Sequence, residues 1–479
     1  ILYFEIRNVM RKIFLILLLS GIILRFFTQF IFPVFNGDEI SLGNNIKHSS
    51  FIELLYPLKY GQSSPPLFLL IQKLIITISP LHFWINVKIL SFISSTLGII
   101  FFYIFIKRNN YKFIFLLPFI ILLFNPFNIS NSLTLKQYTI DLTGIIILVT
   151  YFKTIWFKKY NWIFFMIWCL MSNIGLFACA AYIIFMFIDS NIKMNLSEAY
   201  IFFKKKLLSF TAPVPYIIYF IWFMKQDGAQ ELREFMLLFW HDSFIPLNST
   251  IFKYTLYTIH SLWIFMFNAF EIWGIFLMLL TIPFFISIKR KGLIFRDEIL
   301  LLSIILLIHF VFNLFHLYPF AERLYLYLTP LFILILGASL EILFASKYLR
   351  NYFSKISILI AFTTVFLYSL YNPCNDNDVF GLYEKFKKLR VNTIYATEKS
   401  ISNFNNFDVF TDNVFNHNFS FVSVDSKLDK SKYLISRVSK KIKMNSTSPE
   451  EPLVKKLIQI KKIKKVDQVN GYNIYEIMQ

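Results

Sequence analysis

The sequence predicts an α-helical polytopic membrane protein with a small polar domain after its last span. Of the 479 residues, 57% are hydrophobic and only 16% are charged, whereas a soluble domain averages about 25% charged residues. The apolar residues fall in long blocks that almost fill residues 1–371, and Lys and Arg gather in short runs between the blocks. Residues 372–479 are polar. This composition excludes both a soluble globule and a disordered chain.

The net charge of +20 raises the question of a nucleic-acid partner. The basic residues lie between apolar blocks and form no stripe with interleaved aromatic residues, so we expect no nucleic-acid binding. The three cysteines are Cys169 and Cys179, inside apolar segments, and Cys374, alone beyond them. They support neither a disulfide framework nor a CxxC metal site.

Basic clusters indicate the sidedness of the predicted spans, because cytoplasmic loops carry an excess of Lys and Arg. Arg7, Arg11 and Lys12 place the N-terminus in the cytoplasm. Every later basic cluster falls on the same side when the chain crosses the membrane eleven times. The predicted spans are 13–32, 86–106, 113–130, 140–157, 161–172, 174–189, 207–223, 273–288, 299–316, 324–345 and 356–371. The odd number of spans places residues 372–479 outside the cytoplasm.

One apolar segment, Leu67 to Ile78, is not counted as a span. It has 12 residues and follows Ser63-Ser64-Pro65-Pro66, and a crossing needs about 20 apolar residues. Counting it would also move most basic clusters outside. We therefore expect a helix in the outer interface, within an outer loop that covers residues 33–85.

The polar region 372–479 is predicted to be a small extracytoplasmic α/β domain. Its alternating apolar residues predict short strands, and Asn470-Gly471 is typical of a hairpin turn. The expected strands are 394–396, 409–411, 421–424 and 433–438, with a helix at 449–460 and a hairpin over 465–477.

Polar residues gather at the predicted outer mouths of three spans. Asp38 and Glu39 follow the first span, Lys136, Tyr138 and Asp141 begin the fourth, and Glu322-Arg323 precede the tenth. Each group taken alone is compatible with a solvated cluster at a helix end. Together they favour a substrate path, because charges near hydrocarbon are costly and usually functional. A carboxylate there is suited to act as a general base.

Histidines provide weaker candidates. His241-Asp242 has the residue types of a base with its orienting partner, but an exposed loop pair is the simpler interpretation. His309 and His316 share one predicted helix, and a packed role is favoured over metal binding for both. The seven histidines show no HxxxH or HExxH spacing, so the sequence supports no fixed protein-bound metal.

Three stretches carry a resemblance to a known family. They are Gly37-Asp38-Glu39 with Asn45, Tyr60, Gln62 and Pro65-Pro66-Leu67-Phe68, then Ser132 to Asp141, and Tyr318 to Leu324 with Thr329-Pro330. Over roughly residues 13–345, the chain resembles the integral-membrane glycosyltransferases of the GT-C fold. Within them it is most similar to bacterial relatives of the protein O-mannosyltransferases and of the lipid A aminoarabinose transferases.

The resemblance implies a sugar donor carried on a polyprenyl phosphate and an acceptor that is a lipid, glycan or protein. It implies Asp38 as the base that takes the acceptor proton, with Glu39 beside it positioning the substrate or the loop. Lys136 and Arg323 would bind the phosphate, Tyr138 would hydrogen-bond it, and Asp141 would orient the acceptor or Lys136. Gln62 and Asn45 complete the implied binding residues. The implied location is the bacterial inner (plasma) membrane, and the resemblance leaves open whether a divalent cation bridges the phosphate.

Two positions depart from the family's pattern. Many relatives carry Lys or His where this chain has Ser64, and often an acid where it has Thr134. Other functions therefore remain open: a transporter or flippase of a lipid-linked sugar, a non-catalytic envelope assembly partner, and a polymerase or ligase of surface polysaccharide. A transporter predicts polar residues at mid-span, whereas the charges here gather at one face.

Overall fold

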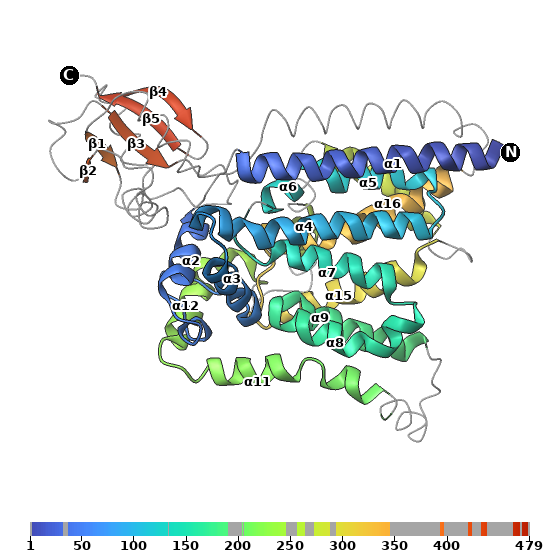
Figure 1. The fold of residues 1–479 in the computed structure, drawn as a ribbon, viewed down its shortest axis with the longest axis horizontal. Helices are drawn as coiled ribbons and strands as arrows, with labels where there is room; N and C mark the ends of the chain where they lie inside the picture. The colour runs from blue at the N-terminus through green and yellow to red at the C-terminus, as the bar shows by residue number, and fades with distance from the viewer. Residues whose placement is uncertain are drawn as a thin grey trace.

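In the computed structural model, the described residues up to 344 are mainly helical (Figure 1). The described residues are 2–31, 37–132, 134–189, 204, 206–245, 256–263, 273–287 and 294–344, together with five strands between 393 and 477. The longer helices are α1 (Leu2–Phe26), α4 (Phe83–Arg108), α7 (Tyr138–Tyr151), α8 (Ile155–Met171), α9 (Asn173–Asp189), α11 (Val214–Phe223), α14 (Trp273–Ile286), α15 (Arg296–Leu314) and α16 (Thr329–Phe344). The shorter elements are η1 (Phe27–Ile31), α2 (Gly37–His48), η2 (Glu53–Leu55), α3 (Pro66–Ile78), η3 (Phe113–Phe115), α5 (Leu116–Phe124), α6 (Pro126–Ser132), α12 (Ala229–Phe239), η4 (His241–Ser243) and η5 (Glu322–Leu328).

Several helices are long and apolar enough to cross a membrane. In the described part of the chain they are Arg7–Phe30, Phe83–Arg108, Lys206–Phe223, Arg296–Leu314 and Leu324–Phe344, and shorter apolar helices lie between them. The protein is therefore a multi-pass membrane protein. Each of the first ten predicted spans coincides with helical structure. The eleventh, 356–371, lies outside the described residues, so the count of eleven stays a prediction.

The predicted continuous span 113–130 is wrong, because the helix is broken at Asn125. α5 ends at Phe124 and α6 starts at Pro126, which has no N–H to continue the ladder. The break exposes carbonyls in the last turn of α5. Arg25 of α1, 1% exposed, donates to the carbonyl oxygens of Leu122 at 3.1 Å and Leu123 at 2.8 Å. A buried arginine thus serves as a cap for the broken helix.

The boundary between the predicted spans 140–157 and 161–172 is also corrected. α7 ends at Tyr151, and α8 begins at Ile155. Thr154 caps α8, because its hydroxyl accepts from the backbone N–H of Phe157 at 3.2 Å. The expected twelve-residue span is therefore a 17-residue helix.

α7 packs at the centre of the helical part, against α4 on one side and η5 on another. Its buried Gly144 allows a close approach of α8, since a Cβ there would lie 2.1 Å from the indole ring of Trp168. Nearly every side chain of α7 is buried. Residues at its start are thus held by neighbours on several sides.

The polar C-terminal region contains a five-stranded sheet of order β2-β1-β3-β5-β4. The strands are β1 (Thr393–Ala396), β2 (Ser420–Ser423), β3 (Tyr433–Arg437), β4 (Ile463–Val469) and β5 (Tyr472–Ile477). β1 pairs in parallel with β2 and β3, and β5 pairs antiparallel with β3 and β4. The predicted strands 394–396, 421–424 and 433–438 coincide with β1, β2 and β3, and the antiparallel pair β4 and β5 lies in the predicted hairpin region, whose turn residues lie outside the described part. The predicted strand 409–411 and helix 449–460 lie outside the described residues, so the α/β domain stays a prediction.

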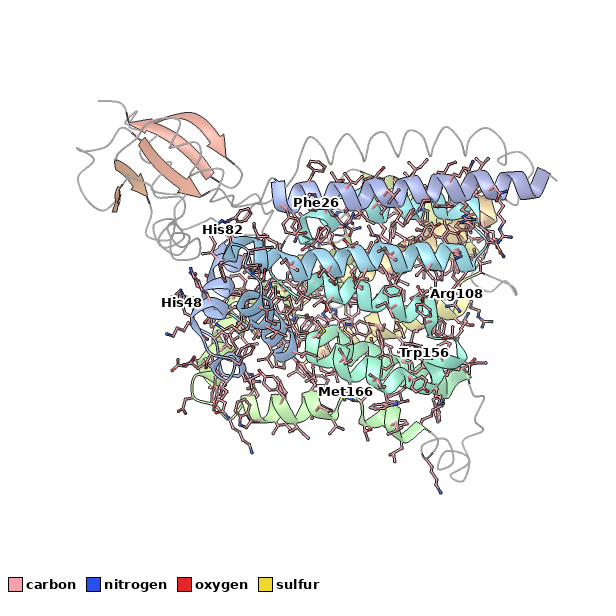
Figure 2. All side chains as sticks on the ribbon, in the orientation of Figure 1. Phe26, His48, His82, Arg108, Trp156 and Met166 are labelled. Atoms are coloured by element: carbon pink, nitrogen blue, oxygen red, sulfur yellow. The ribbon has the colours of Figure 1, made fainter. Side chains whose placement is uncertain are left out.

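The helical part has two distinct ends. α2, α3 and α12 gather at one end, which we call the α2 end (Figure 1). His48 and His82 lie there, whereas Arg108 and Trp156 lie at the opposite end, which we call the far end (Figure 2). Two residues of the predicted outer loop thus lie at the α2 end, and two residues in or beside predicted cytoplasmic basic clusters lie at the far end (Figure 2).

Candidate functional site

The most buried charges of the α2 end form an ion pair between α2 and α4. The Lys88 ammonium lies 2.6 Å from Oε1 of Glu39, and both side chains are 1% exposed. The same carboxylate oxygen accepts from the backbone N–H of Leu135 at 2.8 Å. Glu39 therefore joins α2, α4 and the segment between α6 and α7, which are far apart in sequence.

The segment 134–137 is held by further side chains from two other elements. Ser91, one turn after Lys88 on α4, donates to the carbonyl of Thr134 at 2.8 Å. The hydroxyl of Ser64, just before α3, lies 3.2 Å from Oε1 of Gln137 and donates to it. Ser64 thus has a contact of its own with this segment. Together with Glu39 of α2, these two serines anchor the segment from three different parts of the chain.

Lys136 lies in the middle of this anchored segment. Its side chain is 8% exposed, and its ammonium donates to Oε1 of Gln62 at 2.7 Å. Gln62 is presented by a turn in which Tyr60 and Gly61 both have positive φ, 62° and 61°. Glycine suits this turn for a second reason, because a Cβ at Gly61 would lie 2.5 Å from the ring of Phe235 in α12. The structure thus brings together the predicted residues Glu39, Gln62 and Lys136.

Asp38 precedes Glu39 in the first turn of α2. Carboxylates in the first turn of a helix are stabilised by the N-terminal end of the helix dipole. The two acids differ in environment: Glu39 is enclosed between helices, whereas Asp38 is only half-buried and keeps partial access to solvent. Of the pair, Asp38 is therefore the more exposed acid.

Asn45 has a different position from the one expected for a substrate ligand. Its amide nitrogen donates to the carbonyls of Ser41 at 2.8 Å and Lys59 at 3.1 Å, and its oxygen accepts from the N–H of Lys59 at 2.9 Å. Asn45 therefore fixes the loop that leads to Gln62. Its expected role in substrate binding stays a prediction.

Tyr138 and Asp141 lie at the start of α7 and are 5% and 2% exposed. Asp141 accepts a hydrogen bond from the hydroxyl of Ser172, at the junction of α8 and α9. Asp141 thus faces Ser172, the residue before α9, and its expected role toward Lys136 stays a prediction.

Arg323 lies in η5, which packs against α6 and α7, the helices that flank Lys136. Its side chain, like that of Glu322, lies outside the described part of the structure. The backbone thus places Arg323 in an element beside the Lys136 segment, and its phosphate contact stays a prediction.

The histidine candidates are engaged within the protein. His309 is fully buried, with Nδ1 at 2.6 Å from the hydroxyl of Tyr327 and Nε2 at 3.1 Å from the carbonyl of Pro319. Nε2 of His316 lies 2.8 Å from the carbonyl of Ile245. The predicted packed role of both is confirmed. His241 lies in η4, and the side chain of its neighbour Asp242 lies outside the described residues.

Metal ligands do not cluster in this site. Among the residues that the structure describes, no group of three or more His, Cys, Asp or Glu side chains could hold a metal ion.

Sequence reasoning missed Lys88 and the residues that fix its helix end. Gln29 of η1 donates to the carbonyl of Lys88 and Gln72 of α3 to that of Val87, both at 2.6 Å. A signal was present, because Lys88 is an ionisable residue inside the predicted span 86–106, and such residues are usually functional. Its partner Glu39 is 49 positions away, and no local pattern links the two.

Comparison with known proteins gives the following. No protein-family model and no curated protein sequence matches the chain. ArnT from Cupriavidus metallidurans bound to undecaprenyl phosphate is similar in structure, with 10% identity, a TM-score of 0.49, and coverage of 96% of this chain and 97% of that one. The Archaeoglobus fulgidus oligosaccharyltransferase in complex with Zn and sulfate is also similar, with 11% identity, a TM-score of 0.47, and coverage of 88% and 68%. Both scores lie below 0.5, so the function is argued from this chain's own residues.

Proposed function

We propose that the protein is a membrane glycosyltransferase that moves a sugar from a polyprenyl-phosphate donor to a hydroxyl group of an extracytoplasmic lipid, glycan or protein. One observation carries the proposal. Three segments far apart in sequence, 37–39, 60–64 and 134–138, converge at the α2 end, where one of them carries the half-buried acid Asp38 and another the nearly buried cation Lys136. The resemblance of the same segments to GT-C glycosyltransferases supports it.

In this proposal Asp38 and Lys136 have complementary roles. Asp38 accepts the proton of the acceptor hydroxyl, and the acceptor oxygen attacks the anomeric carbon from the side opposite the phosphate. The new glycosidic bond forms as the bond from the anomeric carbon to the phosphate oxygen breaks, so the sugar centre inverts. The polyprenyl phosphate leaves with the bonding electrons, and Asp38 later releases its proton to water.

Lys136 and Arg323 bind the leaving phosphate, whose negative charge grows during the step. Cations are most effective in a site with little water, where electrostatic stabilisation is strong. The ammonium of Lys136 meets this condition, since the side chain is 8% exposed and oriented by Gln62. Arg323 adds a planar group suited to two phosphate oxygens.

The test of the catalytic role is a paired substitution at the α2 end. Asp38→Asn keeps the shape of the side chain but cannot take the proton, and loss of a general base typically lowers the rate about 10²–10⁴-fold. Donor binding should persist because the phosphate contacts remain. Sugar transfer and polyprenyl-phosphate-sugar binding are measured on the purified variants.

Glu53→Gln is the matched control, because Glu53 is an exposed acid near the same end, in η2. It should transfer sugar at the parent rate. Near-parent transfer by Asp38→Asn contradicts the assignment of the base. Mass spectrometry of envelope lipid extracts with and without the gene then identifies the sugar and acceptor, and an unchanged glycan profile would favour a transporter or an assembly partner.

The proposed topology places the α2 end outside the plasma membrane and the far end in the cytoplasm, with a transferase domain over 1–371 and an extracytoplasmic domain over 372–479. Single cysteines at His48 and Trp156, in a background without Cys374, probe the two ends (Figure 2). A membrane-impermeant maleimide should label His48→Cys on intact spheroplasts and Trp156→Cys only after lysis. The reverse pattern would place the site in the cytoplasm.

A further inference from the structure

The ion pair between Lys88 and Glu39 lies next to Lys136, the proposed phosphate-binding residue. Neither member of the pair is itself proposed to bind the phosphate. Glu39 uses one oxygen, Oε1, for two contacts: the ammonium of Lys88 at 2.6 Å and the N–H of Leu135 at 2.8 Å. Leu135 directly precedes Lys136. The position of the proposed phosphate ligand is therefore coupled to a charge on α4.

The helix that carries Lys88 is itself firmly placed at this point. Its carbonyls at Val87 and Lys88 accept from Gln72 of α3 and Gln29 of η1, both at 2.6 Å. One turn later, Ser91 holds the carbonyl of Thr134. The end of α4 thus fixes the 134–137 segment twice, directly through Ser91 and through Lys88 and Glu39.

We infer that Lys88 is a positioning residue of the proposed glycosyl transfer: its buried charge holds Glu39 in the orientation that places the Leu135–Lys136 backbone for the donor phosphate. This inference rests on the proposed function. It also gives Glu39 a positioning role and leaves Asp38 as the base. Both charges are 1% exposed, so removing either one leaves the other buried without its counter-charge, and the remaining side chain then adjusts to new contacts.

The test is a cycle of three variants: Lys88→Met, Glu39→Gln and the double variant. Each single variant should lower transfer about tenfold or more, chiefly through a higher KM for the donor, because a displacement of about 1 Å can reduce a rate by ~10²-fold. The double variant should regain at least about tenfold over either single one, since it buries neither charge of the pair and the amide introduced by Glu39→Gln still offers an oxygen to the N–H of Leu135. Lys112→Met, at the far end, is the control.

Hydrogen exchange supplies a measurement that needs no sugar transfer. The peptide covering 134–137 should exchange faster in Lys88→Met than in the parent and more slowly again in the double variant, with no change in Lys112→Met. If Lys88→Met does not fold, the inference is tested by comparing the transfer rate and the hydrogen exchange of Glu39→Gln with those of the double variant.

Two results would overturn the inference. In one, the double variant stays as inactive as Glu39→Gln and the loss lies in kcat at unchanged KM, which makes Glu39 the base. In the other, exchange of the 134–137 peptide is the same in the parent, Glu39→Gln and the double variant. If the parent protein transfers no sugar from any polyprenyl-phosphate donor, the proposed function is wrong instead. Hydrogen exchange of the 134–137 peptide then tests only whether the ion pair positions this segment.

Discussion

The two ends of the helical part use the same ion-pair chemistry in opposite environments. At the α2 end, Lys88 and Glu39 are both 1% exposed. At the far end, Lys112 pairs with Glu341 at 3.1 Å with side chains 45% and 37% exposed, and Lys153 pairs with Asp297 with side chains 51% and 48% exposed. Both of these pairs are in contact with solvent, although Lys153 also lies 2.9 Å from a carboxylate oxygen of Glu298, whose side chain is only 10% exposed.

The difference shows where charge determines the fold. An exposed pair is screened by water and contributes about 0–1 kcal/mol. A buried pair gains little over well-packed apolar residues, but losing one partner leaves a charge that the interior cannot accommodate. The protein thus places the buried pair, which cannot lose one partner without a large cost, beside the proposed site. The exposed pairs, which contribute little to stability, lie at the opposite end.

The largest expected effect is on stability at the α2 end. Lys88→Met leaves the Glu39 carboxylate buried without its cation and should destabilise the protein by about 3–5 kcal/mol. Thermal unfolding of the purified protein in detergent measures this loss. A melting temperature within error of the parent would show that Glu39 finds compensation and that burial of the pair has no structural consequence.

A smaller effect, confined to activity, is expected when Arg323, the cation proposed to bind the donor phosphate, is removed. Arg323→Ala should reduce transfer about ten- to a hundredfold, because a hydrogen bond to a charged group contributes about 1.5–3 kcal/mol. Its melting temperature should match the parent, in contrast to Lys88→Met. Arg323→Lys should recover part of the rate. Unchanged use of the donor by the Ala variant would make Arg323 an interface anchor.

The smallest effect belongs to the far end. Lys112→Met removes one member of an exposed pair and should change the free energy of unfolding by less than about 1 kcal/mol, with parent transfer activity. A loss similar to that of Lys88→Met would erase the distinction between the two ends.

Much of the candidate site could be predicted, and the missing parts have a common cause. Glu39 and Lys136 were expected at one face, and the structure joins Glu39 to the N–H of Leu135 and Lys136 to Gln62 of the outer loop. Asn45 belongs to the expected region but is engaged with the loop at Lys59. Lys88 was overlooked, since its importance depends on a partner on another helix.

The sequence by itself determined the elements whose signals are local. Apolar length predicted the helix observed at Phe83–Arg108, the apolar run Leu67 to Ile78 predicted α3, and the strand pattern with Asn470-Gly471 predicted the antiparallel pair of β4 and β5. Such signals lie within a window of a few residues, because helix and strand periodicity and turn chemistry are properties of neighbouring positions.

Tertiary structure alone decided which polar groups meet. Arg25 caps the broken end of α5, 97 and 98 positions away in the chain, and Glu39 joins Lys88 to the N–H of Leu135. Neither contact follows from spacing, because each depends on how helices pack and on which polar atoms the packing leaves buried. A buried polar group must find a partner wherever the fold provides one, and that partner is set by three-dimensional proximity rather than by position in the chain.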